Sequence, residues 1–114
     1  MDLVKKKIEI KIDNEEYVMF FDMKSIAIYK QITATNDNPI GNNFTDGINK
    51  LFNQDNEEII NFIACTLRHK ETEDTPLGRK LFESDILFFL LNFRVYAINL
   101  IAESLPQSND VKKK

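Results

Sequence analysis

The chain opens with a strict alternation of polar and apolar residues. From Lys7 to Ile12 every second residue is isoleucine, and this period of two predicts a half-buried β-strand. Residues 13–16 (Asp-Asn-Glu-Glu) are typical of a turn, and Tyr17 to Phe21 resume a strand-like apolar run. The pattern predicts a β-hairpin over about residues 3–21. Because two strands alone are marginal in water, a helix must cover its apolar face.

Helical spacing replaces the alternation after the hairpin. Asp22 is a suitable N-cap for a helix over 23–33. The polar stretch from Ala34 to Phe44 predicts a surface loop, longer than the median connection. Thr45 or Asp46 then opens a short helix that reaches Phe52.

Two further helices follow. Asp55 and Glu58 resemble a capping box for a helix that ends near His69. Ser84 is the expected cap of a last helix over about 85–104. This helix is apolar on nearly all sides in its first half, so we expect it to lie centrally, with other elements packed around it.

These elements predict an α+β fold that is mostly α. The N-terminal β-hairpin packs on a small bundle of about four helices, with a central C-terminal helix. At 114 residues the chain is expected to be a single domain, 1–114. Its core covers about 3–106, and the termini 1–2 and 107–114 are expected to be flexible.

Composition narrows the function classes. The chain is 43% hydrophobic and 29% charged, with a formal net charge of −3, as in soluble globular proteins. The lysines gather at the two ends, Lys5–Lys7 and Lys112–Lys114. Without a basic stripe, nucleic-acid binding is not expected. No signal peptide is visible, and the longest apolar run, Ile86–Leu91, is far shorter than a membrane span. These features favour the cytoplasm and no membrane.

Few residues offer chemistry. One cysteine, Cys65, and one histidine, His69, exclude an internal disulfide and a His/Cys zinc site, so no metal or cofactor is expected. If the helix extends to His69, the two side chains share a helical face and could form an activated thiolate couple; a buried Cys beside a helix-terminal His is the favoured interpretation. Acidic groups at 15–16, 57–58 and 71–74 are expected to be solvated. No catalytic residue is therefore assigned, and the protein is not expected to be an enzyme.

Aromatic residues are the most notable side chains. A domain this small buries only about 60–65% of its unfolded surface, so some of the rings are expected to stay exposed. Two interpretations remain open: the rings form the core, or they line an apolar surface for a partner or a second copy. The candidate partner-binding residues are Phe20, Phe21, Phe88, Phe89, Phe93 and Tyr96.

The order of segments resembles that of the tail assembly chaperones of long-tailed bacteriophages and of prophages in Gram-positive bacteria. The stretches that carry the resemblance are Phe21–Lys30 (FDMKSIAIYK), Ile60–Arg68 (INFIACTLR), Pro76–Lys80 (PLGRK) and Glu103–Pro106 (ESLP). Together they extend over about residues 8–106. None of them is a catalytic fingerprint.

The resemblance implies a non-enzymatic protein of the host bacterial cytoplasm that is absent from the mature virion. It implies two partners, the tape measure protein and the tail-tube protein, and homo-oligomers are possible. Such families commonly make a longer, frameshifted product. Two alternative functions are a structural tail or head–tail joining protein retained in the virion, and a small nucleic-acid-binding regulator of the prophage.

Overall fold

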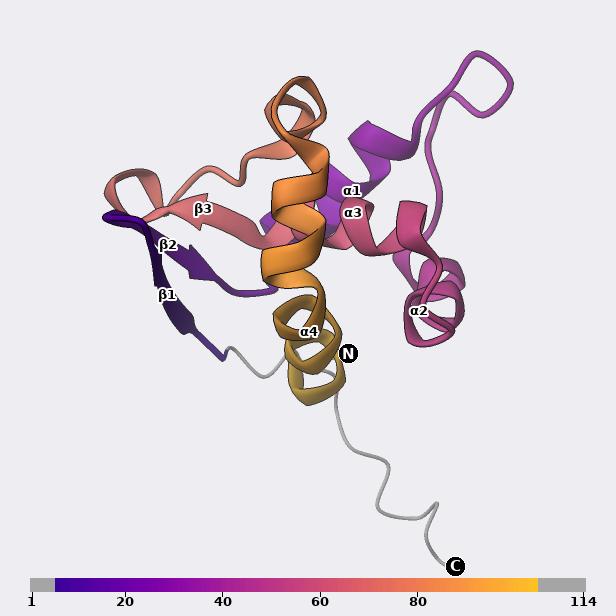
Figure 1. The fold of residues 1–114 in the computed structure, drawn as a ribbon. Coiled ribbons are helices and arrows are strands. Elements are labelled where there is room, and N and C mark those ends of the chain that lie inside the picture. The colour runs from indigo at the N-terminus through magenta and orange to yellow at the C-terminus, as the bar shows by residue number, and fades with distance from the viewer. Residues whose placement is uncertain (1–5, 105–114) are drawn as a thin grey trace, which may run out of the picture.

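A computed structural model describes residues 6–104 of the chain (Figure 1). The termini that the sequence predicts to be flexible, 1–2 and 107–114, lie outside the described residues. The described part contains one three-stranded antiparallel sheet, four α-helices and two short 3₁₀ helices around one hydrophobic core. This is an α+β fold, mostly α, as the sequence predicted.

The predicted hairpin is present. Strands β1 (Ile8–Ile12) and β2 (Glu15–Met19) pair antiparallel, with Ile10 opposite Tyr17. Asp13 and Asn14 form the two-residue turn, with φ of 50° and 71°. A tight hairpin turn favours such left-handed residues, and Asp and Asn adopt them more readily than most side chains. The turn thereby fixes a register in which Ile10 and Tyr17 both face the core.

A third strand completes the sheet, and the sequence did not predict it. Helix α3 ends at Thr66, and β3 (Leu67–His69) pairs antiparallel with β2, Leu67 opposite Met19 and His69 opposite Tyr17. The prediction of a helix as far as His69 is therefore wrong. The free edge of β3 is partly covered, because the Leu67 carbonyl accepts a hydrogen bond of 2.9 Å from the Leu77 N–H.

Short polar side chains start the first two helices. Asp22 caps α1 (Met23–Thr33) as predicted: its carboxylate accepts from the Ser25 N–H, and the Ser25 hydroxyl accepts from the Asp22 N–H, a complete capping box. Helix α2 (Phe44–Phe52) begins slightly earlier than predicted. Its cap is Asn43, whose side chain accepts from the Thr45 N–H at 3.1 Å.

The later helices begin close to the predicted positions, with one changed cap. Asp55 caps α3 (Asn56–Thr66) by accepting from the Glu58 N–H at 2.9 Å. After the 3₁₀ helices η1 (Lys70–Thr72) and η2 (Gly78–Glu83), α4 covers Ile86–Ser104. Asp85, not the predicted Ser84, accepts from the Phe88 N–H at its start. The Ser84 hydroxyl donates to the Lys80 carbonyl instead.

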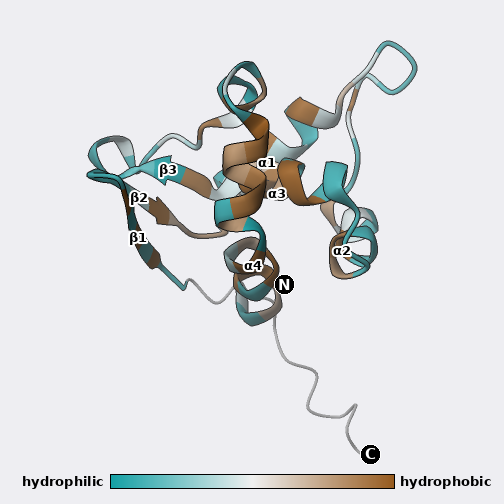
Figure 2. Cartoon of the chain, viewed as in Figure 1, coloured by the Kyte–Doolittle hydropathy of each residue, from teal (hydrophilic) through white to brown (hydrophobic). Residues whose placement is uncertain are grey.

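The central helix is α3, not the C-terminal helix. Eight of the eleven residues of α3 are buried, against six of nineteen in α4. Helix α3 contacts α1, α2, α4 and η2, whereas α4 lies across it on the outside of the molecule, beside the sheet (Figure 1). The expectation of a central α4 is wrong because it assumed that every apolar face of this helix would be covered. Figure 2 shows α4 hydrophobic along much of this uncovered side.

Candidate functional site: the outer face of helix α4

Helix α4 has two apolar faces, and the inner one belongs to the core. Phe93 is fully buried there, its ring 5.3 Å from that of Tyr17 and 5.9 Å from that of Phe89. Ala97, Leu100 and Ile101 continue this face toward the end of the helix. The inner face therefore attaches α4 to the sheet and to α3.

Four of the six candidate partner-binding rings lie in the core. Phe20, Phe21, Phe89 and Phe93 are each at most 8% exposed. The ring of Phe20 packs against the guanidinium of buried Arg68, 3.5 Å from the ring centre. These four rings therefore do not present a surface to a partner. Some rings do stay exposed, as expected, but of the six candidates only Tyr96 is among them.

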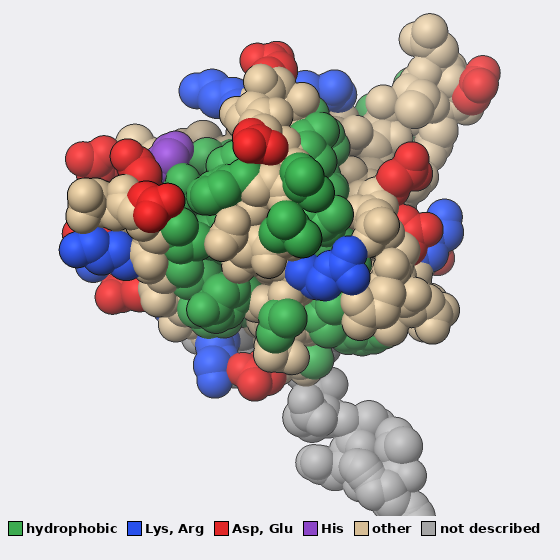
Figure 3. Space-filling view, viewed as in Figure 1, with side chains coloured by type: hydrophobic (Ala, Val, Ile, Leu, Met, Phe, Trp, Pro, Cys, Tyr) green, Lys and Arg blue, Asp and Glu red, His purple; other side chains and the backbone are tan. Residues whose placement is uncertain are grey.

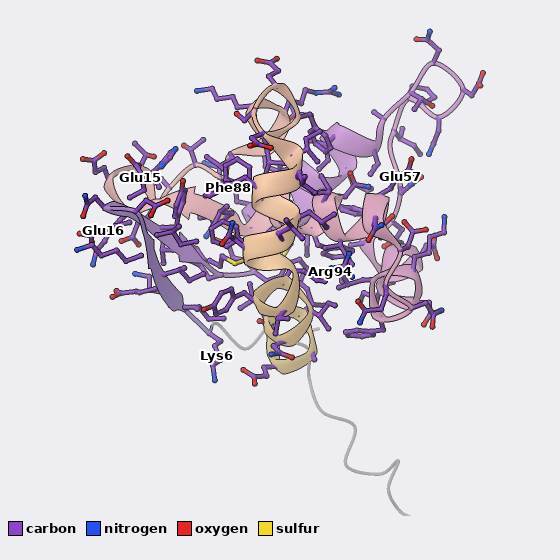
Figure 4. The ribbon with its side chains drawn as sticks, viewed as in Figure 1. Lys6, Glu15, Glu16, Glu57, Phe88 and Arg94 are labelled. Carbon is purple, nitrogen blue, oxygen red and sulfur yellow. The ribbon has the colours of Figure 1, made fainter. Side chains whose placement is uncertain are left out.

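Phe88 and Tyr96 are the two candidates that reach solvent. Phe88 is half-buried and meets Phe89 edge-on, with ring centres 5.1 Å apart. Tyr96 is 40% exposed, and its ring centre lies 6.4 Å from that of Phe93. Both border the outer face of α4, and Figure 4 shows Phe88 on the side toward the sheet.

The outer face of α4 carries an apolar stripe, and the candidate set contained only one of its residues, Phe88. Leu91 and Val95 are 70% and 64% exposed, and Leu87 beside them is 62% exposed. Figure 3 shows hydrophobic side chains gathered over α4 on this face. We call the following residues, spaced by three and four, the outer stripe: Phe88, Leu91, Val95, Ile98 and Ala102.

The sequence contained a signal for this stripe. Steps of 3, 4, 3 and 4 residues place five apolar side chains on one face of a helix. The residues that became the inner face form a second series on the opposite side. The apolar first half of the helix predicted a central position, although the double pattern also describes a helix with two separate contact faces.

One positive charge flanks the outer stripe. Arg94 is the only charged residue between Asp85 and Glu103. Its guanidinium donates to the side-chain oxygens of Gln54, at 3.2 Å, and Asn56, at 2.5 Å. Both acceptors are neutral amides, so the described contacts orient the guanidinium without neutralising it. Figure 4 shows Arg94 on the side of α4 away from the sheet.

By length and composition alone, α4 could cross a membrane, although the longest uninterrupted apolar run had suggested no such segment. The core helix of a globular protein can be equally long and apolar. Here 28% of the stretch is buried in the protein. Its inner face packs on the core, while the outer stripe and the neighbouring Ile86, Leu87 and Tyr96 reach solvent.

A buried polar pair lies on the other side of α3. The Tyr29 hydroxyl donates to the Glu58 carboxylate, and both side chains are buried. Burial and the neighbouring carboxylate raise the pKa of Tyr29. The expectation of a solvated carboxylate at 58 is therefore wrong: Glu58 points into the interior instead of completing the capping box of α3. Glu57 beside it is exposed, as expected (Figure 4).

Gly47 leaves the room for this pair. A methyl group at position 47 would overlap both the Tyr29 hydroxyl and the Glu58 carboxylate. We expect Gly47→Ala to lower the free energy of unfolding by about 1–3 kcal/mol, because the crowded pair must shift. Urea denaturation measures the change. Asn49→Ala, an exposed change on the same helix, is the matched control; an equal effect of both substitutions would contradict the assignment.

Cys65 and His69 do not form the couple that the sequence allowed. Because α3 ends at Thr66, the two residues share no helical face. Cys65 is fully buried, and desolvation raises the pKa of its thiol. The His69 ring stacks on Tyr17, with centres 5.3 Å apart. The favoured interpretation is right about the buried Cys65 but wrong about the helix-terminal His, because His69 lies in β3.

Glu15 and Glu16 are exposed at the hairpin turn (Figure 4). Among residues 6–104, no group of three His, Cys, Asp or Glu side chains could hold a metal ion. A cleft of about 680 Å³ lies between α1, β3 and η2, with Ile28 and Arg79 in its lining. Arg79 donates to the Gln31 carbonyl at 2.7 Å, so this charge helps join η2 to α1.

Comparison with protein-family models, with curated proteins and with solved structures finds no match to this chain. The function must therefore be inferred from the sequence and the site.

Proposed function

We propose that the protein is a non-enzymatic tail assembly chaperone of a long-tailed phage or prophage. It binds the tape measure protein in the host cytoplasm, helps to recruit tail-tube subunits, and leaves before the virion is complete. The order of segments in the sequence suggests this family. The observation that carries the proposal is the exposed outer stripe of α4.

A chaperone for a long helical client needs apolar surface that is open while the chaperone itself is folded. The outer stripe meets this requirement, because α4 is attached to the core through its other face. The exposed Leu91 and Val95 and the half-buried Phe88, at helical spacing, suit contact with an amphipathic client. Several copies along one client would add avidity without strong individual sites.

Co-expression tests the proposal. We expect the tape measure protein encoded beside this chain to be mostly insoluble when expressed alone, and to be soluble and co-purified when this chain is present. The control is co-expression with an unrelated acidic domain of similar size. If the tape measure protein stays insoluble and unbound in both cases, the proposed function is wrong.

Mass spectrometry of purified virions separates the chaperone from the alternative of a retained tail or head–tail joining protein. A chaperone is expected to leave at most trace peptides. Peptides in amounts comparable to those of the tail-tube protein would favour the structural alternative.

A further inference from the structure

We infer that the outer stripe of α4 is the docking site for one amphipathic α-helix of the client, and that this helix carries an acidic residue opposite Arg94. The identity of the client rests on the proposed function. The shape and charge of the docked segment rest on the described residues alone.

The spacing of the stripe specifies a helix as the occupant. Apolar residues at alternating steps of three and four are those that pack along a second helix at a crossing angle of about 20°. The stripe from Phe88 to Ala102 is about 21 Å long at 1.5 Å per residue. A client helix of about four turns therefore covers it.

Arg94 specifies the charge of the occupant. In a heptad that places Val95 at position a and Leu91 at position d, Arg94 occupies position g, beside the contact. A residue at g meets position e or g of the facing helix, where an opposite charge forms a salt bridge. Since Gln54 and Asn56 are neutral, an Asp or Glu of the client supplies the counter-charge.

A second copy of the chain fits this requirement poorly. In a parallel pair with aligned stripes, Arg94 would face Asn99 of the other copy, which carries no charge. In an antiparallel pair, position g faces position g, where this helix offers Leu87, Arg94 and Ile101. Neither arrangement of two identical stripes places a carboxylate beside Arg94, so a different chain is the better occupant.

A membrane surface also fits poorly. Helices that lie on membranes usually carry several Lys or Arg residues along the polar side. Between residues 86 and 102, α4 has Arg94 alone, and the formal net charge of the chain is −3. Membrane binding therefore becomes an alternative outcome of the test.

The test compares full-length variants in co-purification with the tape measure protein. Leu91→Gln with Val95→Gln is expected to reduce the amount captured about tenfold, because the centre of an interface carries most of its affinity. Ile40→Gln is the matched control, since Ile40 is 76% exposed but lies in the loop before α2. It should capture as much as the wild type. Circular dichroism confirms that all variants are folded.

Variants of Arg94 test whether the docked helix carries an acidic residue opposite this position. Arg94→Glu is expected to reduce capture about fivefold, as for a salt bridge at an interface rim replaced by like charges, and Arg94→Lys should retain most of it. If Arg94→Glu captures as much as the wild type, no acidic residue faces this position and that part is overturned.

The remaining outcomes distinguish the two proposals. If the wild type captures the client and the double Gln variant captures it equally, the docking site is elsewhere while the proposed function stands. If the wild type captures nothing, both fail. Sedimentation of the wild type alone as a dimer that the double Gln variant dissociates would assign the stripe to a second copy. Flotation with phosphatidylcholine vesicles, lost in the same variant, would assign it to a membrane.

Discussion

Replacing Phe93 with alanine is expected to lower the free energy of unfolding by about 3–5 kcal/mol. The side chain is fully buried between the sheet and α4, in contact with the rings of Tyr17 and Phe89. Its removal leaves a cavity that rigid neighbours on two elements cannot fill. Urea denaturation followed by circular dichroism measures the loss, and an unchanged denaturant slope would show that the native fold persists.

Leu91→Ala is the matched control, only two residues away on the same helix. Because Leu91 is 70% exposed, we expect a change within about 0.5 kcal/mol. The pair of variants therefore separates the inner face of α4 from the outer stripe by stability alone. A large cost for Leu91→Ala would mean that the stripe is covered in the purified protein.

The second large effect concerns Asp22, which both caps α1 and pairs with Arg68. The guanidinium of Arg68 is completely buried, and its Nη2 donates to Asp22 at 3.2 Å and to Ser25 at 3.1 Å. Among the described residues, its Nε and Nη1 have no hydrogen-bond partner. Asp22→Ala removes the counter-charge, so we expect a loss of about 2–4 kcal/mol.

Asp55→Ala provides the comparison for this loss. Asp55 caps α3 by accepting from the Glu58 N–H, but it has no capping box and forms no ion pair among the described residues. Its removal is expected to cost about 1 kcal/mol. The difference between the two variants in urea denaturation then measures the pairing with Arg68 together with the bond from the Ser25 hydroxyl to Asp22. Equal losses would show that Asp22 acts as a cap alone.

The same pair predicts a dependence on pH. Burial by itself would raise the pKa of Asp22, but the hydrogen bond from the Ser25 N–H and the charge of Arg68 outweigh it and lower the pKa below 3.8. A lowered pKa in the folded state means that this stabilisation is present above the unfolded pKa and is lost as the pH falls through the folded one. The stability difference between wild type and Asp22→Asn should shrink below about pH 4.

The predictable parts of the fold are those set by neighbouring residues. The alternation before Asp13 and the turn residues after it gave the hairpin, and Asp22 and Asp55 gave the starts of two helices. The capping bonds join residues three positions apart, and the two-residue turn brings Ile12 opposite Glu15, also three positions apart. Local pattern is sufficient for such features.

The features that escaped prediction depend on distant segments. Strand β3 has three residues, too few to show a period, and it exists because β2 offers an edge about fifty positions earlier. Glu58 looked like a capping residue, but Tyr29, from another helix, offers it a buried partner. The placement of α4 outside α3 likewise depends on how all helices share the core.

The candidate site was predictable only in part, because the exposure of a side chain also depends on how distant segments pack. Composition indicated surplus apolar side chains, and Phe88 and Tyr96 do lie at the edge of the exposed face. Choosing aromatic residues as the partner-binding candidates selected mostly buried side chains, because large rings fill the core first. Leu91 and Val95 are exposed because of their position on the helix. The spacing of three and four residues indicates this position, whereas the residue types alone do not.

The sheet is asymmetric in how it ends. On one side, the short β3 is screened where the Leu77 N–H bonds the Leu67 carbonyl. On the other side of the sheet, β1 has no further neighbouring strand among the described residues. Two exposed lysines lie there: Lys11 within β1 and Lys7 directly before it. The edge along β1 is therefore the more open one for a foreign strand, and the two lysines there discourage the aggregation to which open edges are prone.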